Sequence, residues 1–231
     1  MIRVLAADNA TPLPESIREE LLTSLPAAMH PAIQRYKRWQ DRQAALLGKW
    51  LVRQALLAEH HPGHTLQSWR LGPFGKPSVA EDIFFNISHT DGLVLCAVTR
   101  VGEIGIDCER IRPLDLHDFE RLFPRDAWEE IEAATDPFLA FFDAWTRREA
   151  LLKADGRGLS FPLEHLRITG NRGTVGENGN HWSILPVAVP IGLCCHVALA
   201  SPKRGSSLLP PTFFEDQDPP ITLEPLWKSA I

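Results

Sequence analysis

The chain has 231 residues, a net charge of −5 and 44% hydrophobic residues, enough for one large domain or two of about a hundred residues. The negative charge argues against a general nucleic-acid binder. No apolar run reaches the roughly eighteen residues of a membrane span, and the apolar part of the N-terminus is too short for a signal peptide. The four cysteines lack the spacing of a disulfide framework, so we expect reduced thiols in a cytoplasmic protein.

The first half of the chain predicts helices followed by a group of strands. Residues 15–25 indicate a short helix, and a longer one is predicted over 31–59, before the breaker residues His61-Pro62-Gly63. Strand-like segments follow at 66–71, 83–88, 93–99 and 104–108. Thr90-Asp91-Gly92 is typical of a hairpin turn between two of them.

The second half repeats this order. Arg112-Pro113 marks the expected change of half, and helical segments are predicted at 116–122 and 125–134. Asp136 and Pro137 suit the N-cap and first position of a longer helix that reaches residue 154, with Gly156 just past its end. Strands are expected at 166–169, 182–185 and 193–199. The order predicts an α+β fold with two similar lobes, residues 1–112 and 113–201. Residues 202–231 form a proline-rich tail that cannot build a core of its own.

Acidic and basic side chains are spaced so that they can converge. Asp107 and Glu109 lie two residues apart, so on a strand both carboxylates leave the same face. Glu149 and Lys153 lie four residues apart, so on a helix they share a face. Three converging acids are costly unless a cation neutralises them, and oxygen ligands suit Mg²⁺. A Mg²⁺ site beside a lysine indicates chemistry on a phosphate.

The motifs resemble those of 4'-phosphopantetheinyl transferases of the surfactin-synthetase-activating type. Five segments carry the resemblance in the expected order: Gly75-Lys76-Pro77, Phe85-Asn86-Ile87-Ser88-His89, Gly105-Ile106-Asp107-Cys108-Glu109, Trp145 to Lys153, and Gly156-Arg157-Gly158-Leu159. It covers roughly residues 35 to 200. The resemblance implies two lobes in pseudo-two-fold arrangement, each a small, mainly antiparallel sheet with a packed long helix, and an active site in the cleft between them.

The resemblance also implies a reaction. The 4'-phosphopantetheine of coenzyme A would pass to a serine of an apo carrier protein, and adenosine 3',5'-bisphosphate would leave. Mg²⁺ held by Asp107, Glu109 and Glu149 would bridge the pyrophosphate oxygens. Lys153 would stabilise or protonate the leaving group, and Glu149 is the favoured base for the serine proton. Ala127 stands where members of the family often have a glutamate, another candidate base, which weakens any assignment of the base to that segment.

Coenzyme A carries a 3'-phosphate as well as a pyrophosphate, so it needs cations at two places. The resemblance assigns Lys76 and His89 to the phosphates, Ser88 to the nucleotide region, and basic residues of the N-terminal lobe to the 3'-phosphate. A basic stripe runs along the helix expected over 31–59, and its members are Arg35, Arg38, Arg42, Lys49 and Arg53. Such a stripe on an isolated helix is more simply a solvated face. Within it, Arg38 and Arg42 are preferred for the 3'-phosphate.

Two other functions stay open. A Mg²⁺-dependent nucleotide phosphohydrolase would use the same charges with water as the nucleophile, whereas a non-catalytic carrier-protein or coenzyme-A-binding module would not need Glu149 and Lys153. His60, His61 and His64 lie in a breaker loop without matching ligands, which disfavours zinc there. The carrier itself, from fatty-acid, polyketide or nonribosomal-peptide synthesis, is not indicated, although acidic carriers predict a basic or apolar patch beside the cleft. We expect a monomer that binds neither nucleic acid nor membrane.

Overall fold

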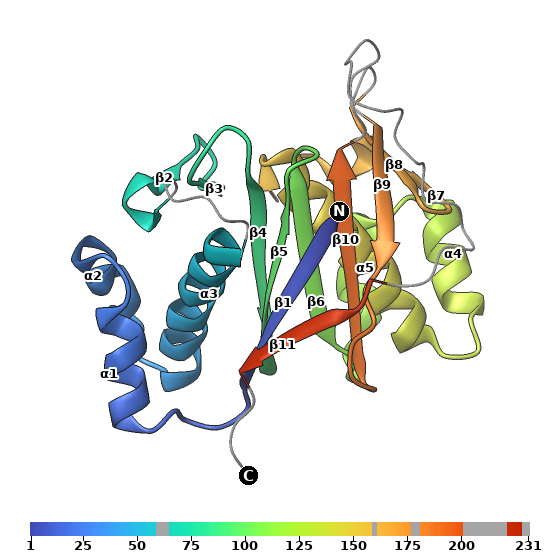
Figure 1. Ribbon diagram of the computed structural model, residues 1–231. Helices are drawn as coiled ribbons and strands as arrows, with labels where there is room; N and C mark the ends of the chain where they lie inside the picture. Colours follow the sequence, from blue (N-terminus) through green and yellow to red (C-terminus); the bar gives the residue numbers. More distant parts are fainter. Residues whose placement is uncertain (59–64, 159–160, 177–180, 201–220, 228–231) are drawn as a thin grey trace.

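The computed structural model describes residues 1–58, 65–158, 161–176, 181–200 and 221–227. Two central sheets lie between two groups of helices, one group on the outer face of each sheet (Figure 1). This arrangement confirms the predicted α+β fold with two lobes. Among the described residues, no helix combines the length and the apolarity needed to cross a membrane.

The N-terminal lobe contains a four-stranded sheet in the order β11-β1-β5-β4. Its strands are β1 (Ile2–Asn9), β4 (Phe84–Thr90), β5 (Gly92–Thr99) and β11 (Leu223–Trp227). All neighbours are antiparallel except β1 and β11. The helices on its outer face are α1 (Glu15–Thr23), α2 (His30–Gln34) and α3 (Trp39–Ala58). A short hairpin of β2 (Arg70–Leu71) and β3 (Pro77–Ser78) completes this lobe.

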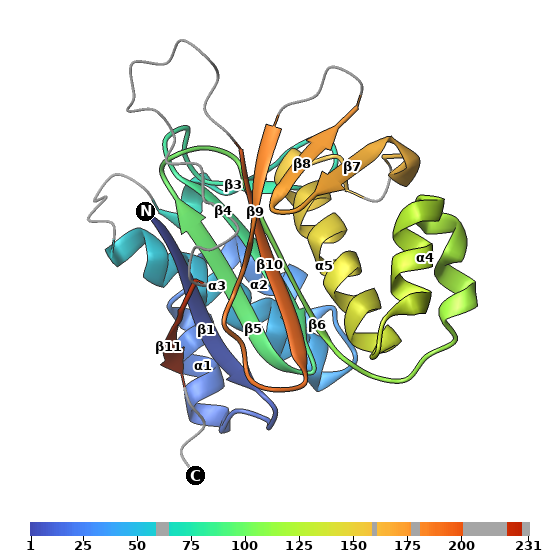
Figure 2. The ribbon, with the colours of Figure 1, turned by 90° about the vertical axis from the view of Figure 1, so that its right-hand side faces the viewer.

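The C-terminal lobe contains an antiparallel five-stranded sheet in the order β6-β10-β9-β8-β7. Its strands are β6 (Ile104–Arg110), β7 (Leu166–Thr169), β8 (Arg172–Val175), β9 (His181–Pro186) and β10 (Leu193–Ala200). Figure 2 shows α5 (Pro137–Asp155) alongside β6 and β10, with α4 (Arg125–Ala133) beside it. Asp136 caps α5 by accepting from the N–H of Leu139 at 3.0 Å, and Gly156 ends it with φ of 89°. Both predicted helix boundaries are confirmed.

Successive side chains of a strand point to opposite faces of its sheet, so each sheet contributes to a core on both faces. On β5, Val94 and Cys96 pack in the core beneath α3, whereas Leu95 and Ala97 face the other sheet. The second lobe supplies the opposing apolar residues of this inter-sheet core, chiefly Ile104, Ile106, Cys108, Val197 and Leu199. The two lobes therefore share one continuous apolar layer, which holds them in a defined relation.

The sheets meet where β4 lies beside β6. Every second side chain of β4 accepts a hydrogen bond from a backbone N–H of β6: Asn86 from Ile106 (3.0 Å), Ser88 from Cys108 (3.2 Å) and Thr90 from Arg110 (3.1 Å). Side-chain acceptors thus satisfy the β6 edge in place of a backbone ladder. We call this contact the β4–β6 seam. It sets the register between the two lobes.

Several predicted elements are wrong. The helix expected over 31–59 is interrupted, because α2 ends at Gln34 and α3 begins at Trp39; residue 59 and the histidines at 60, 61 and 64 lie outside the described residues. Four of the residues at 34–38 are exposed, so this polar stretch has too little apolar surface to be held helical by packing. The strand expected over 66–71 is a 3₁₀ turn at Leu66–Ser68 followed by the two-residue β2. The helical segment predicted at 116–122 is confirmed, as a 3₁₀ helix.

The tail contributes one element that composition does not reveal. Residues 223–227 form β11, which pairs in parallel with β1 as the edge strand of the first sheet. A segment without a core of its own is thus ordered by backbone hydrogen bonds to a strand at the other end of the chain. The rest of the tail, residues 202–220 and 228–231, lies outside the described residues, as does Leu159.

Gly105 sets the approach of α5 to β6, and its replacement tests this packing. A Cβ there would overlap the backbone carbonyl oxygen of Ala150 and the backbone N of Ala154. Because backbone atoms cannot rotate away, we expect Gly105→Ala to lower the free energy of unfolding by about 3 kcal/mol in urea titrations. Gly102→Ala is the control, since its Cβ would meet Ala200 at an ordinary 3.6 Å. Equal losses in both variants would contradict this account.

Candidate active site

A partly buried ion pair between α5 and β6 lies where the two lobes meet. Lys153 Nζ of α5 lies 2.6 Å from Asp107 Oδ1 of β6, and Asp107 is only 4% exposed. Ser88 Oγ of β4 lies 3.3 Å from each of these two atoms. A single carboxylate therefore joins β4, β6 and α5. Lys153 thus supplies the counter-charge of the buried Asp107 carboxylate, while part of its own side chain reaches solvent.

The second oxygen of Asp107 has no such contact. Oδ2 is buried and has no hydrogen-bond partner among the described residues. Burying a carboxylate oxygen costs free energy when the oxygen loses its hydrogen bonds to water and gains no other donor. The atom is therefore placed where a bound cation would satisfy it.

Glu109 and Glu149 complete the acidic set. Glu109 shares a face of β6 with Asp107, and Glu149 lies one turn before Lys153 on α5. Burial, then the charges of Asp107 and Glu149, raise the pKa of Glu109 to about 7, against the opposing effect of Lys153. Burial and Asp107 also raise the pKa of Glu149. The acids thus repel one another through space, as the predicted convergence requires.

The three acids of this set do not converge on a single point. Asp107, Glu109 and Glu149 are all described, yet their carboxylates do not form a cluster with oxygen atoms all within 4.8 Å of one another. Lys153 lies on Asp107 and neutralises one member of the set. The structure therefore brings the three acids into electrostatic contact without closing them around one point.

Lys76 and His89 flank this group. Lys76 Nζ donates to Glu103 at 2.5 Å and to the carbonyl of Ala154 at 2.7 Å, beside the C-terminal end of α5. His89, on β4 next to Ser88, is exposed at its surface. Partial desolvation and then the charge of Lys153 lower its pKa, so its imidazole is neutral at neutral pH. Lys76 thus approaches α5 from one end while His89 approaches Lys153 from β4.

The predicted 3'-phosphate residues lie at the start of α3. Arg38 is exposed, and its carbonyl accepts from the N–H of Arg42 at 3.1 Å in the first turn. The charge of Asp41, next to Arg42, partly opposes the decrease in the pKa of His89, so this end of α3 lies near the end of β4 that carries His89. The interruption at 35–38 removes Arg35 and Arg38 from the helix, so the five basic residues do not form one helical stripe.

Sequence reasoning missed the β4–β6 seam, although a signal was present. Asn86, Ser88 and Thr90 are polar residues at every second position of β4. That pattern indicates one polar side of the strand. The hydroxyl of Ser88 is occupied by Cys108 and Asp107, and its assignment to the nucleotide region stays a prediction.

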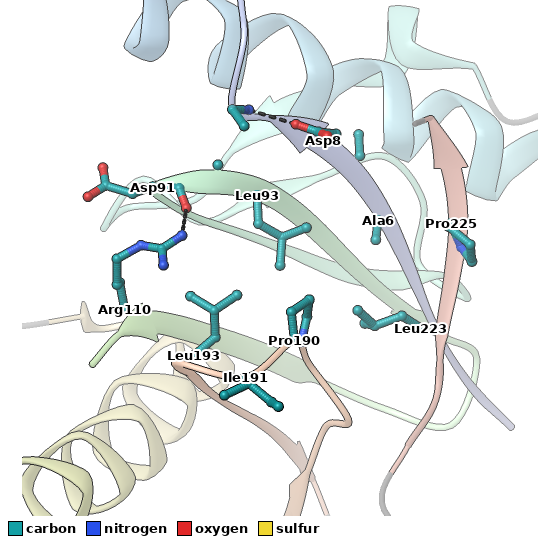
Figure 3. Close-up of a pocket in the computed structure, with 13 residues that line it drawn as sticks. Ala6, Asp8, Asp91, Leu93, Arg110, Pro190, Ile191, Leu193, Leu223 and Pro225 are labelled. Carbon is teal, nitrogen blue, oxygen red and sulfur yellow. Dashed lines mark hydrogen bonds between the residues drawn. The ribbon is translucent and has the colours of Figure 1, made fainter. Parts of the chain in front are cut away.

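A separate cavity lies behind the acidic set. It has a volume of about 420 Å³ and is lined mainly by apolar side chains, including Leu93, Pro190 and Leu193 (Figure 3). Arg110 lies at its rim and donates to the carbonyl of Asp91 at 2.8 Å. Successive residues of a strand point to opposite faces, so Arg110 points away from the face that carries Glu109. This cavity is therefore not part of the acidic site.

Comparison with known proteins identifies the family of the chain. Residues 103–188 match the sequence model of the 4'-phosphopantetheinyl transferase superfamily. The chain is 30% identical to the 4'-phosphopantetheinyl transferase gsp of Aneurinibacillus migulanus over 174 residues, which are 74% of this chain and 73% of that protein. It is 27% identical to the transferase Sfp of Bacillus subtilis over 68% of this chain and 71% of that protein. It is 34% identical to the transferase HetI of Nostoc over 54% and 57%. The chain belongs to the 4'-phosphopantetheinyl transferase superfamily.

Proposed function

We propose that this protein transfers the 4'-phosphopantetheine of coenzyme A to a serine of an apo carrier protein and releases adenosine 3',5'-bisphosphate. The observation that carries the proposal is the buried Lys153–Asp107 pair, with Asp107 Oδ2 unsatisfied beside it. A site built from acids and a lysine acts on phosphate by positioning and electrostatics. Membership of the superfamily directs that chemistry to phosphopantetheine.

The acidic set fits Mg²⁺. Asp107, Glu109 and Glu149 offer only oxygen ligands, Asp107 Oδ2 is buried without a donor, and the other two acids have raised pKa values. We assign these three residues to the metal. When bound, Mg²⁺ supplies polarisation of the pyrophosphate and neutralisation of the charge that develops on it.

The chain's own residues provide the proton transfers. Glu149 accepts the proton of the carrier serine, and its raised pKa makes it a stronger base than an exposed glutamate. The serine oxygen forms a bond to the β-phosphorus while the bond to the bridging pyrophosphate oxygen breaks. Lys153, held by Asp107 and Ser88, stabilises or protonates the departing phosphate.

Coenzyme A is placed along the side of the site that faces α3 and β3. Lys76 and His89 hold its phosphates, Ser88 faces the nucleotide region, and Arg38 and Arg42 hold the 3'-phosphate. A cavity of about 520 Å³ opens beside Lys76, between the loop at Gly72–Phe74 and the end of α5 at Gly156, and offers room for part of the nucleotide.

Residues 1–112 and 113–201 are the two lobes of this proposal, and the site lies at their boundary. By this division of the sequence, residues 1–112 contribute the partners of the cofactor phosphates and the two metal ligands of β6, a strand that joins the C-terminal sheet. Residues 113–201 contribute Glu149 and Lys153. We propose that the enzyme is a cytoplasmic monomer that acts on carriers of fatty-acid, polyketide or nonribosomal-peptide synthesis. Its net charge of −5 fits neither a nucleic-acid nor a membrane surface.

The reaction is tested by incubating the protein with coenzyme A, Mg²⁺ and a panel of apo carrier proteins. Intact-mass spectrometry should show one phosphopantetheine added to a carrier, and the panel ranks the carriers at the same time. Consumption of coenzyme A without any carrier would instead identify a phosphohydrolase.

The raised pKa of Glu109 predicts a pH dependence of the metal-free protein. In EDTA, folded Glu109 keeps its proton up to about pH 7, whereas the unfolded chain releases it near pH 4.5. The free energy of unfolding should therefore fall by about 1–2 kcal/mol between these pH values, after allowance for solvent screening. Glu109→Gln should flatten this decrease, and the exposed Glu19→Gln should not. Mg²⁺ should restore stability at pH 8, and a wild-type curve that rises from pH 5 to 7 would exclude this account.

Lys153 is expected to act mainly in the transition state. Lys153→Met should lower kcat about 10²–10³-fold while leaving the KM for coenzyme A nearly unchanged. The control is Lys49→Met, which removes a half-buried lysine of α3 that lies near the ring of Trp69. This variant should keep near wild-type turnover. A raised KM with unchanged kcat would show that Lys153 only holds the substrate.

The placement of the 3'-phosphate can be tested with 3'-dephospho-coenzyme A. A charge-assisted contact is worth about 1.5–3 kcal/mol, so the wild type should prefer coenzyme A ten- to a hundredfold in kcat/KM at one salt concentration. Changing Arg38 and Arg42 together to Gln should erase most of this preference, because it weakens the binding of coenzyme A and leaves that of 3'-dephospho-coenzyme A unchanged. The same change at Arg18 and Arg125, on α1 and α4, is the control. Equal losses for both cofactors would refute the placement.

A further inference from the structure

A second group of side chains able to bind a metal lies between α5 and β10, the strand next to β6. Asp143 of α5 and Cys194 and His196 of β10 each offer one ligand atom, and these atoms all lie within 4.8 Å of one another. Cys194 and His196 are two residues apart, so both leave the face of β10 that α5 covers. Their exposures are 8% and 2%, whereas the side chain of Asp143 is 43% exposed. One end of the group therefore reaches solvent.

The hydrogen bonds around His196 leave two acceptors facing each other. Thr146 Oγ1 donates to the carbonyl of Phe142 at 2.7 Å and lies 2.8 Å from His196 Nδ1. With its own proton used, the hydroxyl accepts from Nδ1–H, so the neutral imidazole presents a lone pair at Nε2. That lone pair faces Asp143 Oδ1, which is also an acceptor.

The separation of these acceptors suits a shared cation. His196 Nε2 lies 3.5 Å from Asp143 Oδ1, beyond the length of a well-formed hydrogen bond. Two ligands of a tetrahedral ion with bonds of about 2.0–2.1 Å are about 3.4 Å apart. Arg147 donates to the other oxygen, Asp143 Oδ2, at 2.7 Å and so orients Oδ1 toward the ring. Thr146 and Arg147 thus have the positions of residues that orient metal ligands.

The chemistry of the three side chains indicates which metal they would bind. A thiolate, an imidazole and one carboxylate are a mixed sulfur, nitrogen and oxygen set, which favours Zn²⁺ over Mg²⁺. Binding to the metal requires the thiolate of Cys194, so the thiol proton is released to solvent. A cavity of about 700 Å³ lined by Asp143, Ala144 and Arg147 provides an entry path and room for a water as fourth ligand.

We propose that Asp143, Cys194 and His196 bind one Zn²⁺ ion, with water in the fourth position. The ion joins the N-terminal half of α5 to β10, whereas Glu149 and Lys153 lie farther along the same helix. Its role is to stabilise the packing of the helix that carries the proposed catalytic residues. The site is independent of the Mg²⁺ assignment, because the two sets share no ligand.

Cobalt is the probe for this site. The chelator-treated full-length protein, in saturating Mg²⁺, should bind one Co²⁺ per chain and develop the near-ultraviolet charge-transfer band of a thiolate ligand. One Zn²⁺ should displace it and raise the Tm. Cys194→Ala should lose the band, whereas Cys195→Ala should keep it, because Cys195 points into the inter-sheet core. Thr146→Val should weaken Zn²⁺ binding about 10- to 100-fold.

The outcomes separate this site from the acidic one. Asp107→Ala should bind Co²⁺ with an unchanged band, even if transfer of phosphopantetheine is lost. A wild-type protein that takes up no Co²⁺ or Zn²⁺ would overturn the proposal, and this result does not depend on whether any variant folds. A band that persists in Cys194→Ala would overturn it as well, since the thiolate would then come from elsewhere.

Discussion

The position of every proposed catalytic group depends on the β4–β6 seam. Its acceptors recur at every second residue, so a shift of β4 by one residue would turn them all away from β6 and leave three backbone N–H groups without partners. The middle pair, Ser88 with Cys108, lies directly beside Asp107. On the other side of β6, Gly105 lets α5 approach until Lys153 reaches that carboxylate. Three elements from two lobes therefore meet at one atom with little freedom to adjust.

The charges at this point show how the structure limits the cost of bringing three acids together. Burial, and then the charge of Asp107, raise the pKa values of Glu109 and Glu149. Lys153 limits the cost by neutralising Asp107, the most buried of the three. One oxygen of Asp107 still lacks a partner. The local charge therefore favours an additional cation, which suits the proposed binding of Mg²⁺ together with a phosphate.

Local patterns in the sequence predict the elements around the site. They fail where contacts between residues far apart in the chain determine the structure. The spacing of Asp107 and Glu109 predicts their shared face, and Asp136 and Gly156 predict both ends of α5. The break before Trp39 depends on missing tertiary contacts along an exposed stretch, which helix propensity does not register. Strand β11 depends on a partner some two hundred residues away in the chain, and no short window contains that information.

The same distinction applies to the two proposed metal sets. Asp107 and Glu109 are neighbours in sequence, so their convergence can be read from a motif, whereas Asp143 meets Cys194 and His196 only because α5 packs on β10. In the register of the second sheet, His196 lies opposite Asp107 and Cys194 opposite Glu109. Sets of different chemistry thus stand side by side under one helix. Oxygen-only ligands suit a hard ion, and sulfur with imidazole suits a softer one. Ligand type rather than distance would therefore direct the two proposed ions to their own sites.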